Sequence, residues 1–223
     1  CDNPIEPVQM AAQERVIEEE TTGGVVAGVD VGGSEAETVI AGRRSRTVLP
    51  LMAFREAHEG RRSGRVAAEL RDAGATGIYV DHIGIGDSLT SRLEEVGLTA
   101  TGINVGLPAH DPTRYADLAS ELWWSLREHL DPSRPDPWAL PPDPVLTAQL
   151  VSRRYSFTPK GQIKVESKKE YRKRTNAPSP DRADALLLTL GGESHGPPPA
   201  GGVLTQRGRP ALAYHAARRS RWQ

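Results

Sequence analysis

The order of apolar and amphipathic segments is the feature that most constrains this fold. Three short runs rich in β-branched residues come first, and tight turns join them, which is typical of an antiparallel meander. Segments of helical periodicity separate the later apolar runs, so those strands need crossover connections and are expected to be parallel. We expect strands at 25–31, 36–42, 46–54, 77–81 and 99–106, and helices at 60–73, 86–96, 113–130, 145–152 and 181–190.

This order predicts an α/β fold with a mixed β-sheet flanked by helices on both faces. The first strand is expected at the centre of the sheet with the fourth strand beside it, which is a ribonuclease H-like arrangement. Residues 155–167 are predicted to form two short strands around a Pro-Lys-Gly turn, an added β-hairpin near the C-terminal part. Residues 131–144 contain six prolines and are expected to form a surface loop, and 168–174 are expected to form a basic helical turn.

Composition divides the chain into three parts. We expect residues 1–22 to be a helical lead-in from an absent upstream domain, 23–192 to be the folded domain, and 193–223 to be a disordered basic tail rich in Pro, Gly and Arg. The one cysteine, Cys1, excludes an intramolecular disulfide and a Cys-based zinc site. No apolar run approaches the roughly 18 residues of a membrane span, so we expect no membrane partner.

The net charge of −1 conceals an asymmetry along the chain. Residues 1–150 contain 13 Lys and Arg against 24 Asp and Glu, whereas residues 151–223 contain 15 against 5. An acidic half joined to a basic half suggests carboxylate chemistry beside a surface that binds a polyanion. A soluble protein with a basic tail and no such function is the alternative.

Two aspartates stand where a charge is costly. Asp30 lies between Val29 and Val31 inside an apolar strand, and Asp81 ends the strand 77–81. If the first and fourth strands are parallel neighbours, both carboxylates emerge at the carboxyl edge of the sheet, where α/β proteins place their ligands. Adjacent carboxylates repel each other unless a cation binds, and their hard oxygen atoms favour Mg²⁺ or Mn²⁺.

The helix 181–190 adds further carboxylates. Its apolar face is expected to pack on the sheet, with Asp184 at the edge of that face and Asp181 one turn earlier on the same side. Three or four such carboxylates could hold two metal ions roughly 4 Å apart, an arrangement suited to hydrolysing a phosphodiester. Each aspartate alone has a structural alternative as a turn former or helix cap, and Asp181 could act only on the helix dipole.

Other polar residues near this edge are weaker candidates. Asp87 is a possible fourth ligand, but it is expected to be the N-cap of the helix 86–96. His82 follows Asp81, and a structural role is favoured for it. Glu35 and Glu37 lie near the same edge.

Three segments carry a resemblance to a known family. GVDVGG (28–33), YVDHIGIGDSL (79–89) and SPDRADALLL (179–188) resemble motifs of the nuclease domain of phage terminase large subunits. The resemblance covers about residues 10–190, and the third motif, with the preceding hairpin and KKEYRKR stretch, is its most specific part. It implies that Asp30, Asp81 and Asp184 bind metal, and it leaves the role of Asp181 open.

The family cuts concatemeric viral DNA during genome packaging, with a ribonuclease H-like fold and two divalent metal ions. The resemblance therefore implies a metal-dependent endonuclease acting on double-stranded DNA, in the cytoplasm of a bacterial host. It also implies an upstream ATPase motor, a portal and a small terminase subunit as partners. This chain lacks the G-x-x-x-x-G-K-[ST] motif and is therefore not the motor itself.

A basic segment is expected to hold the DNA. Residues 153–174 contain nine basic residues and two acidic ones, and such clusters bind phosphates with little sequence preference and strong salt dependence. A solvated charged helix is the alternative for any one of them. The predicted DNA-binding residues are Arg153, Arg154, Lys160, Lys164, Lys168, Lys169, Arg172, Lys173 and Arg174.

Three other functions remain open from the sequence. GVDVGGS also resembles the phosphate-binding first hairpin of sugar-kinase and actin-like ATPases, although this length leaves no room for their two lobes. A Holliday-junction-resolvase-like nuclease would use the same carboxylates on branched DNA. A catalytically inactive DNA-binding module would bind DNA without metal.

Overall fold

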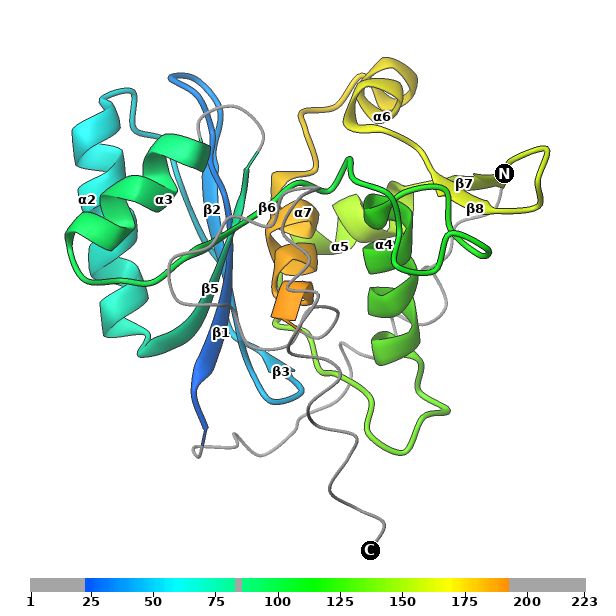
Figure 1. Cartoon of the computed structure of the whole chain (residues 1–223), viewed down its shortest axis with the longest axis horizontal. Helices are drawn as coiled ribbons and strands as arrows, with labels where there is room; N and C mark the ends of the chain where they lie inside the picture. Colours follow the sequence, from blue (N-terminus) through cyan, green and yellow to red (C-terminus); the bar gives the residue numbers. More distant parts are fainter. Residues whose placement is uncertain (1–22, 83–85, 193–223) are drawn as a thin grey trace, which may run out of the picture.

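A mixed sheet lies between two layers of helices in the computed structural model, which describes residues 23–82 and 86–192 (Figure 1). The strand order is β3-β2-β1-β5-β6, and β4 also pairs with β2. The strands are β1 (Val25–Asp30), β2 (Thr38–Arg44), β3 (Thr47–Val48), β4 (Met52–Phe54), β5 (Ala75–Asp81) and β6 (Thr101–Ile103). The helices are α2 (Glu59–Asp72), α3 (Gly86–Glu95), α4 (Leu118–Leu130), α5 (Pro144–Ser152), α6 (Lys168–Thr175) and α7 (Asp181–Leu188).

The central strand β1 has an antiparallel neighbour on one side and a parallel neighbour on the other. It pairs antiparallel with β2 and parallel with β5, and β5 pairs parallel with β6. This arrangement confirms the predicted mixed sheet with the first strand at its centre. It also confirms that the strand ending at Asp81 lies beside the strand ending at Asp30.

Each face of the sheet has its own hydrophobic core. The helices α2 and α3 cover one face, and α4, α5 and α7 lie on the other (Figure 1). In α2 the apolar residues recur with helical spacing, and Gly74 follows the helix with φ +66°, a conformation that glycine adopts without strain. The first core includes Val29, Val66, Leu70, Val80, Leu89 and Leu93, and the second includes Tyr79, Leu122, Trp123, Leu126, Leu150 and Leu186.

The predicted hairpin forms as a separate two-stranded sheet of β7 (Tyr155–Phe157) and β8 (Ile163–Val165). Its turn contains Gly161 with φ +78°, where glycine is favoured. The Val165 backbone N–H donates to the Ser120 hydroxyl at 3.0 Å, so the hairpin is tied to α4. The helix α6 follows the hairpin directly and leads towards α7 (Figure 1).

Several predicted boundaries are wrong for local reasons. Residues 46–54 form two strands instead of one, because Pro50 between β3 and β4 has no N–H for the ladder. The helix predicted from residue 113 begins at Leu118, because the Asp117 carboxylate caps it by accepting from the Ser120 N–H at 2.8 Å. Residues 99–106 contribute only the short strand β6.

The start of α7 also differs from the prediction. Ser179 is a plausible cap in the sequence, but the N-cap position belongs to Pro180, and Ser179 instead hydrogen-bonds the side chain of Asp181. The helix itself ends at Leu188, followed by a tighter turn in which the Leu190 N–H donates to the Leu187 carbonyl. The predicted lead-in 1–22 and tail 193–223 lie outside the described residues. Among the residues that are described, the helices are too short or too polar to cross a bilayer.

Candidate metal centre

The ends of two neighbouring strands place the first pair of carboxylates. Val29 of β1 is in register with Val80 of β5, so the next residues, Asp30 and Asp81, leave the sheet side by side. Asp30 is 6% exposed, and the side chain of Asp81 is 13% exposed. A charge buried to this extent is stable only when it is compensated.

Close packing of α7 on β1 brings the other two carboxylates to the same edge. A Cβ atom on Gly28 would lie 2.0 Å from the Ala185 carbonyl oxygen, so only glycine permits this approach. The apolar face of α7 is fully buried against the sheet, including Ala183, Leu186 and Leu188. Asp181 and Asp184 in its first turn therefore reach the ends of β1 and β5.

The resulting cluster has the geometry of a cation site. One carboxylate oxygen from each of Asp30, Asp181 and Asp184 lies within 4.8 Å of the other two. The Asp184 Oδ2 atom is buried and accepts no hydrogen bond from the described part of the chain, although it forms an ion pair with the Lys168 ammonium group. Carboxylate oxygens alone favour hard divalent cations, so the donor set fits Mg²⁺ or Mn²⁺.

Lys168 lies among these carboxylates, and its position was not evident from the sequence. Its ammonium group is 3.1 Å from Asp30 Oδ2, 3.2 Å from Asp184 Oδ2 and 3.6 Å from Asp81 Oδ2. The sequence predicts Lys168 as one DNA contact among nine, with nothing to distinguish it. The Ser167–Glu170 capping box starts α6 and places Lys168 in its first turn, but only tertiary packing points that turn at the site.

The electrostatics of the cluster follow from burial and from this ammonium group. Burial raises the pKa of Asp30 to about 7, Lys168 opposes that rise, and the carboxylates of Asp184, Asp181 and Asp81 add to it. Burial disfavours the charged form of Lys168, but the carboxylates outweigh it and hold the pKa of Lys168 above its usual range. The ammonium group therefore compensates part of the negative charge that a metal ion would compensate more fully.

Asp181 belongs to the cluster but is less enclosed. Burial raises the pKa of Asp181, while the Ser179 hydrogen bond and Lys168 act in the opposite direction. Glu37 contributes a smaller repulsion, so this carboxylate, directly before β2, is close enough to influence the pKa of Asp181. These contacts place Asp181 within the carboxylate cluster, and it is not a remote first-turn charge.

Asp87 and His82, two weaker candidates near this edge, contact each other. Asp87 lies within the first turn of α3, which begins at Gly86, so Asp87 is not the N-cap. Its side chain is 70% exposed and lies 3.8 Å from the His82 Nδ1 atom. The ring of His82 packs against the backbone of β6, where a Cβ atom on Gly102 would lie 2.9 Å from Nδ1.

The basic segment divides into buried and exposed members. Arg153 is only 3% exposed, and its guanidinium stacks 5.1 Å from the Trp123 ring and 5.6 Å from the Tyr171 ring. This burial removes Arg153 from the predicted DNA surface, because a phosphate cannot reach it. The exposed members are Arg154, Lys160, Lys164, Lys169, Arg172, Lys173 and Arg174.

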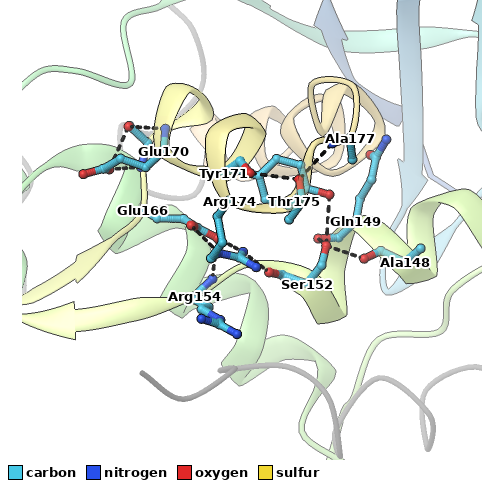
Figure 2. Close-up of polar contacts among 11 residues, drawn as sticks. Ala148, Gln149, Ser152, Arg154, Glu166, Glu170, Tyr171, Arg174, Thr175 and Ala177 are labelled. Carbon is cyan, nitrogen blue, oxygen red and sulfur yellow. Dashed lines mark hydrogen bonds and ion pairs between the residues drawn. The ribbon is translucent and has the colours of Figure 1, made fainter.

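Arg174 is exposed but already engaged. Figure 2 shows its side chain reaching from α6 to the Glu166 carboxylate, directly after β8, and to the Ser152 carbonyl at the end of α5, to which it donates at 2.6 Å. The Glu166 carboxylate also accepts from the Arg154 N–H at 3.0 Å. Arg154, Lys164 and Arg174 line a cavity of about 320 Å³ together with Glu166 and Glu170. Arg174 thus ties α6 to the end of the hairpin and to the end of α5.

Comparison with solved structures identifies the same architecture in phage proteins. The nuclease domain of the large terminase subunit gp2 of bacterial virus Sf6, in a variant with manganese, has a TM-score of 0.71 and 18% identity, over 84% of this chain and 98% of that chain. The large terminase nuclease from thermophilic phage G20c has a TM-score of 0.61 and 16% identity, over 86% of this chain and 98% of that chain. The Thermus phage P74-26 large terminase nuclease domain has a TM-score of 0.54 and 17% identity, over 76% of this chain and 79% of that chain.

Structures of these phage domains have also been determined with calcium, cobalt and magnesium. No protein-family model matches the sequence, and no curated protein matches it. The similarity to the phage domains is therefore one of three-dimensional structure, because the sequence identities of 16–18% are too low for these sequence comparisons to detect. The chain has the ribonuclease H-like fold of the large terminase nuclease domains, the fold that its sequence motifs predict.

Proposed function

We propose that this domain is a metal-dependent endodeoxyribonuclease of a viral genome-packaging terminase, which hydrolyses phosphodiester bonds of concatemeric double-stranded DNA. The single observation that carries the proposal is the buried carboxylate cluster of Asp30, Asp181 and Asp184, with Asp81 beside it at the carboxyl edge of the sheet. The phage terminase nuclease domains with this fold, and the metals in their structures, support it.

The carboxylates would hold two Mg²⁺ or Mn²⁺ ions. Metal ions bound there would supply Lewis acidity, both for activating water and for stabilising the leaving oxygen of the cleaved strand. Asp30 and Asp81 would orient one side of the site from rigid strand ends, and Asp184 and Asp181 would close it from α7. Lys168 would balance the charge of these carboxylates in the absence of metal.

The DNA backbone would bind along the exposed basic residues beside this centre. The hairpin tip contributes Lys160, its second strand contributes Lys164, and the outer side of α6 contributes Lys169, Arg172 and Lys173. Contacts of this kind neutralise phosphates without reading bases, so little sequence preference is expected. In a complete terminase an ATPase motor, a portal and a small subunit would deliver the DNA, in the cytoplasm of a bacterial host.

Plasmid cleavage tests the proposal. Supercoiled plasmid is incubated with the protein in Mg²⁺, in Mn²⁺ and in EDTA, using wild type, Asp30→Ala, Asp184→Ala and the control Asp72→Asn, whose side chain is exposed on α2. Nicking is expected with either metal in wild type and in the control, and it should disappear in EDTA and in both site variants. Cleavage that persists in Asp184→Ala would overturn the assignment of the centre.

One observation favours a second function. An ammonium group among the carboxylates is also what a catalytically inactive DNA-binding module would contain, because Lys168 can compensate the charge without metal. Such a module would retard plasmid on a gel in EDTA as well as in Mg²⁺ and would leave it uncut.

A further inference from the structure

The helix α7 carries two of the four site carboxylates, yet it begins without a cap of its own. The first N–H groups of a helix have no partner within it and need acceptors from elsewhere. The N-cap residue is Pro180, whose side chain has no acceptor atom. The first turn of α7 is therefore held by groups that lie elsewhere in the sequence.

Gln149 of α5 supplies the missing acceptor. Its Oε1 atom accepts from the Arg182 N–H at 2.9 Å and from the Ala183 N–H at 3.0 Å. These two amides lie between Asp181 and Asp184 in the chain. A single side-chain oxygen thus fixes the stretch of backbone from which both carboxylates project.

An ion pair strengthens the same connection. The Arg182 Nη1 atom lies 2.8 Å from both carboxylate oxygens of Asp143. Asp143 also caps α5, because its Oδ1 atom accepts from the Val145 and Leu146 N–H groups at 2.9 and 3.0 Å. The Arg182 and Asp143 side chains are 21% and 13% exposed, so solvent screens this pair only partly. Asp143 therefore joins the N-terminal ends of α5 and α7.

We propose that Gln149, together with the Asp143–Arg182 pair, is a positioning element that holds Asp181 and Asp184 in the geometry needed for metal binding. The inference rests on the proposed function, since it concerns the same metal centre. The contacts at Gly28 fix α7 at Ala185 and Leu188, beyond the carboxylates. The contacts from α5 act on the first turn, where the carboxylates are.

Two substitutions of similar size separate this role from simple packing. Gln149→Met removes the acceptor and keeps the side-chain length, whereas Gln149→Glu keeps an acceptor oxygen in place. Mn²⁺ affinity of the whole chain is measured by titration calorimetry, with backbone amide exchange of Arg182 and Ala183 in EDTA as a second measurement. Loss of a residue that orients metal ligands typically weakens metal binding about 10- to 100-fold.

The expected result is about tenfold or weaker Mn²⁺ binding and faster amide exchange in Gln149→Met, with Gln149→Glu close to wild type in both. Equal Mn²⁺ affinity in wild type and Gln149→Met would overturn the inference, as would equal loss in the Met and Glu variants. Failure of the nuclease function looks different. A wild-type protein that binds Mn²⁺ but leaves plasmid uncut contradicts the proposed activity, while the difference between the variants still tests Gln149.

Discussion

Neutralising Asp30 should make the metal-free protein more stable while abolishing the proposed nuclease activity. Asp30 is 6% exposed, and its pKa is raised from 3.8 to about 7, first by burial and then by neighbouring carboxylates, against the attraction of Lys168. A pKa difference of that size corresponds to about 4 kcal/mol. The ionised form of Asp30 thus destabilises the folded, metal-free state by roughly this amount, and Asp30→Asn keeps the shape without the charge.

The sign of the pH dependence follows from the raised pKa. The folded protein retains the Asp30 proton up to about pH 7, whereas the unfolded chain releases it near pH 3.8. The stability contributed by this proton is complete below about pH 4 and is lost as the pH rises to about 7. The advantage of Asp30→Asn over wild type should therefore grow between about pH 4 and pH 7 and stay constant above that.

Urea unfolding in EDTA at several pH values between about 4.5 and 8 measures this difference. At pH 8 we expect the free energy of unfolding of Asp30→Asn to exceed that of wild type by about 2–4 kcal/mol. The substitution also removes the ion pair between Asp30 and Lys168, and this loss offsets part of the gain. Added Mn²⁺ should then stabilise wild type but not the variant, since only the folded wild type binds the ion tightly. A variant that is less stable than wild type at pH 8, or a stability difference that does not depend on pH, would refute the reasoning.

Asp72→Asn serves as the exposed control and should leave the free energy of unfolding within about 0.5 kcal/mol of wild type at every pH.

Three further predictions follow from the contacts of single residues. Lys168→Ala should lower the free energy of unfolding in EDTA at pH 8 by about 2 kcal/mol, because buried carboxylates lose their counter-charge. Mn²⁺ should restore the lost stability, and thermal melts with and without the metal measure both effects. Gly28→Ala should cost about 2–4 kcal/mol in urea unfolding, because its Cβ atom would meet the Ala185 carbonyl oxygen at 2.0 Å, and unchanged stability would mean that α7 does not pack there. Lys164→Ala should weaken DNA binding equally for all sequences and reduce the slope of log K against log salt by about 1, as measured by fluorescence anisotropy; an unchanged slope would remove Lys164 from the interface.

The aspartates of the candidate site can be predicted from the sequence, because the free-energy cost of burying their charge depends on the strand that contains them. A carboxylate inside an apolar strand, as at Asp30, or at the end of one, as at Asp81, is unfavourable whatever the rest of the fold does. The strand order then brings the two together, because parallel neighbours end at the same edge of a sheet. Asp184 follows from the helical period of its own segment. Hydrophobic periodicity and strand order depend on neighbours in the chain, so the ribonuclease H-like architecture was predictable as well.

The surroundings of the carboxylates depend on elements far apart in the sequence, and only the tertiary structure decided them. Lys168 and Arg153 belong to one basic cluster, yet the first lies among the carboxylates and the second is buried against Trp123. Gln149 has no sequence signal at all, because a side chain that caps a helix about 30 residues away leaves no local pattern. Periodicity tells which residues face the core of an element, but the direction in which a polar side chain points depends on how the elements pack. The sequence alone therefore predicted the carboxylates of the candidate site, and the packing of α5, α6 and α7 around the sheet decided which groups compensate, position and surround them.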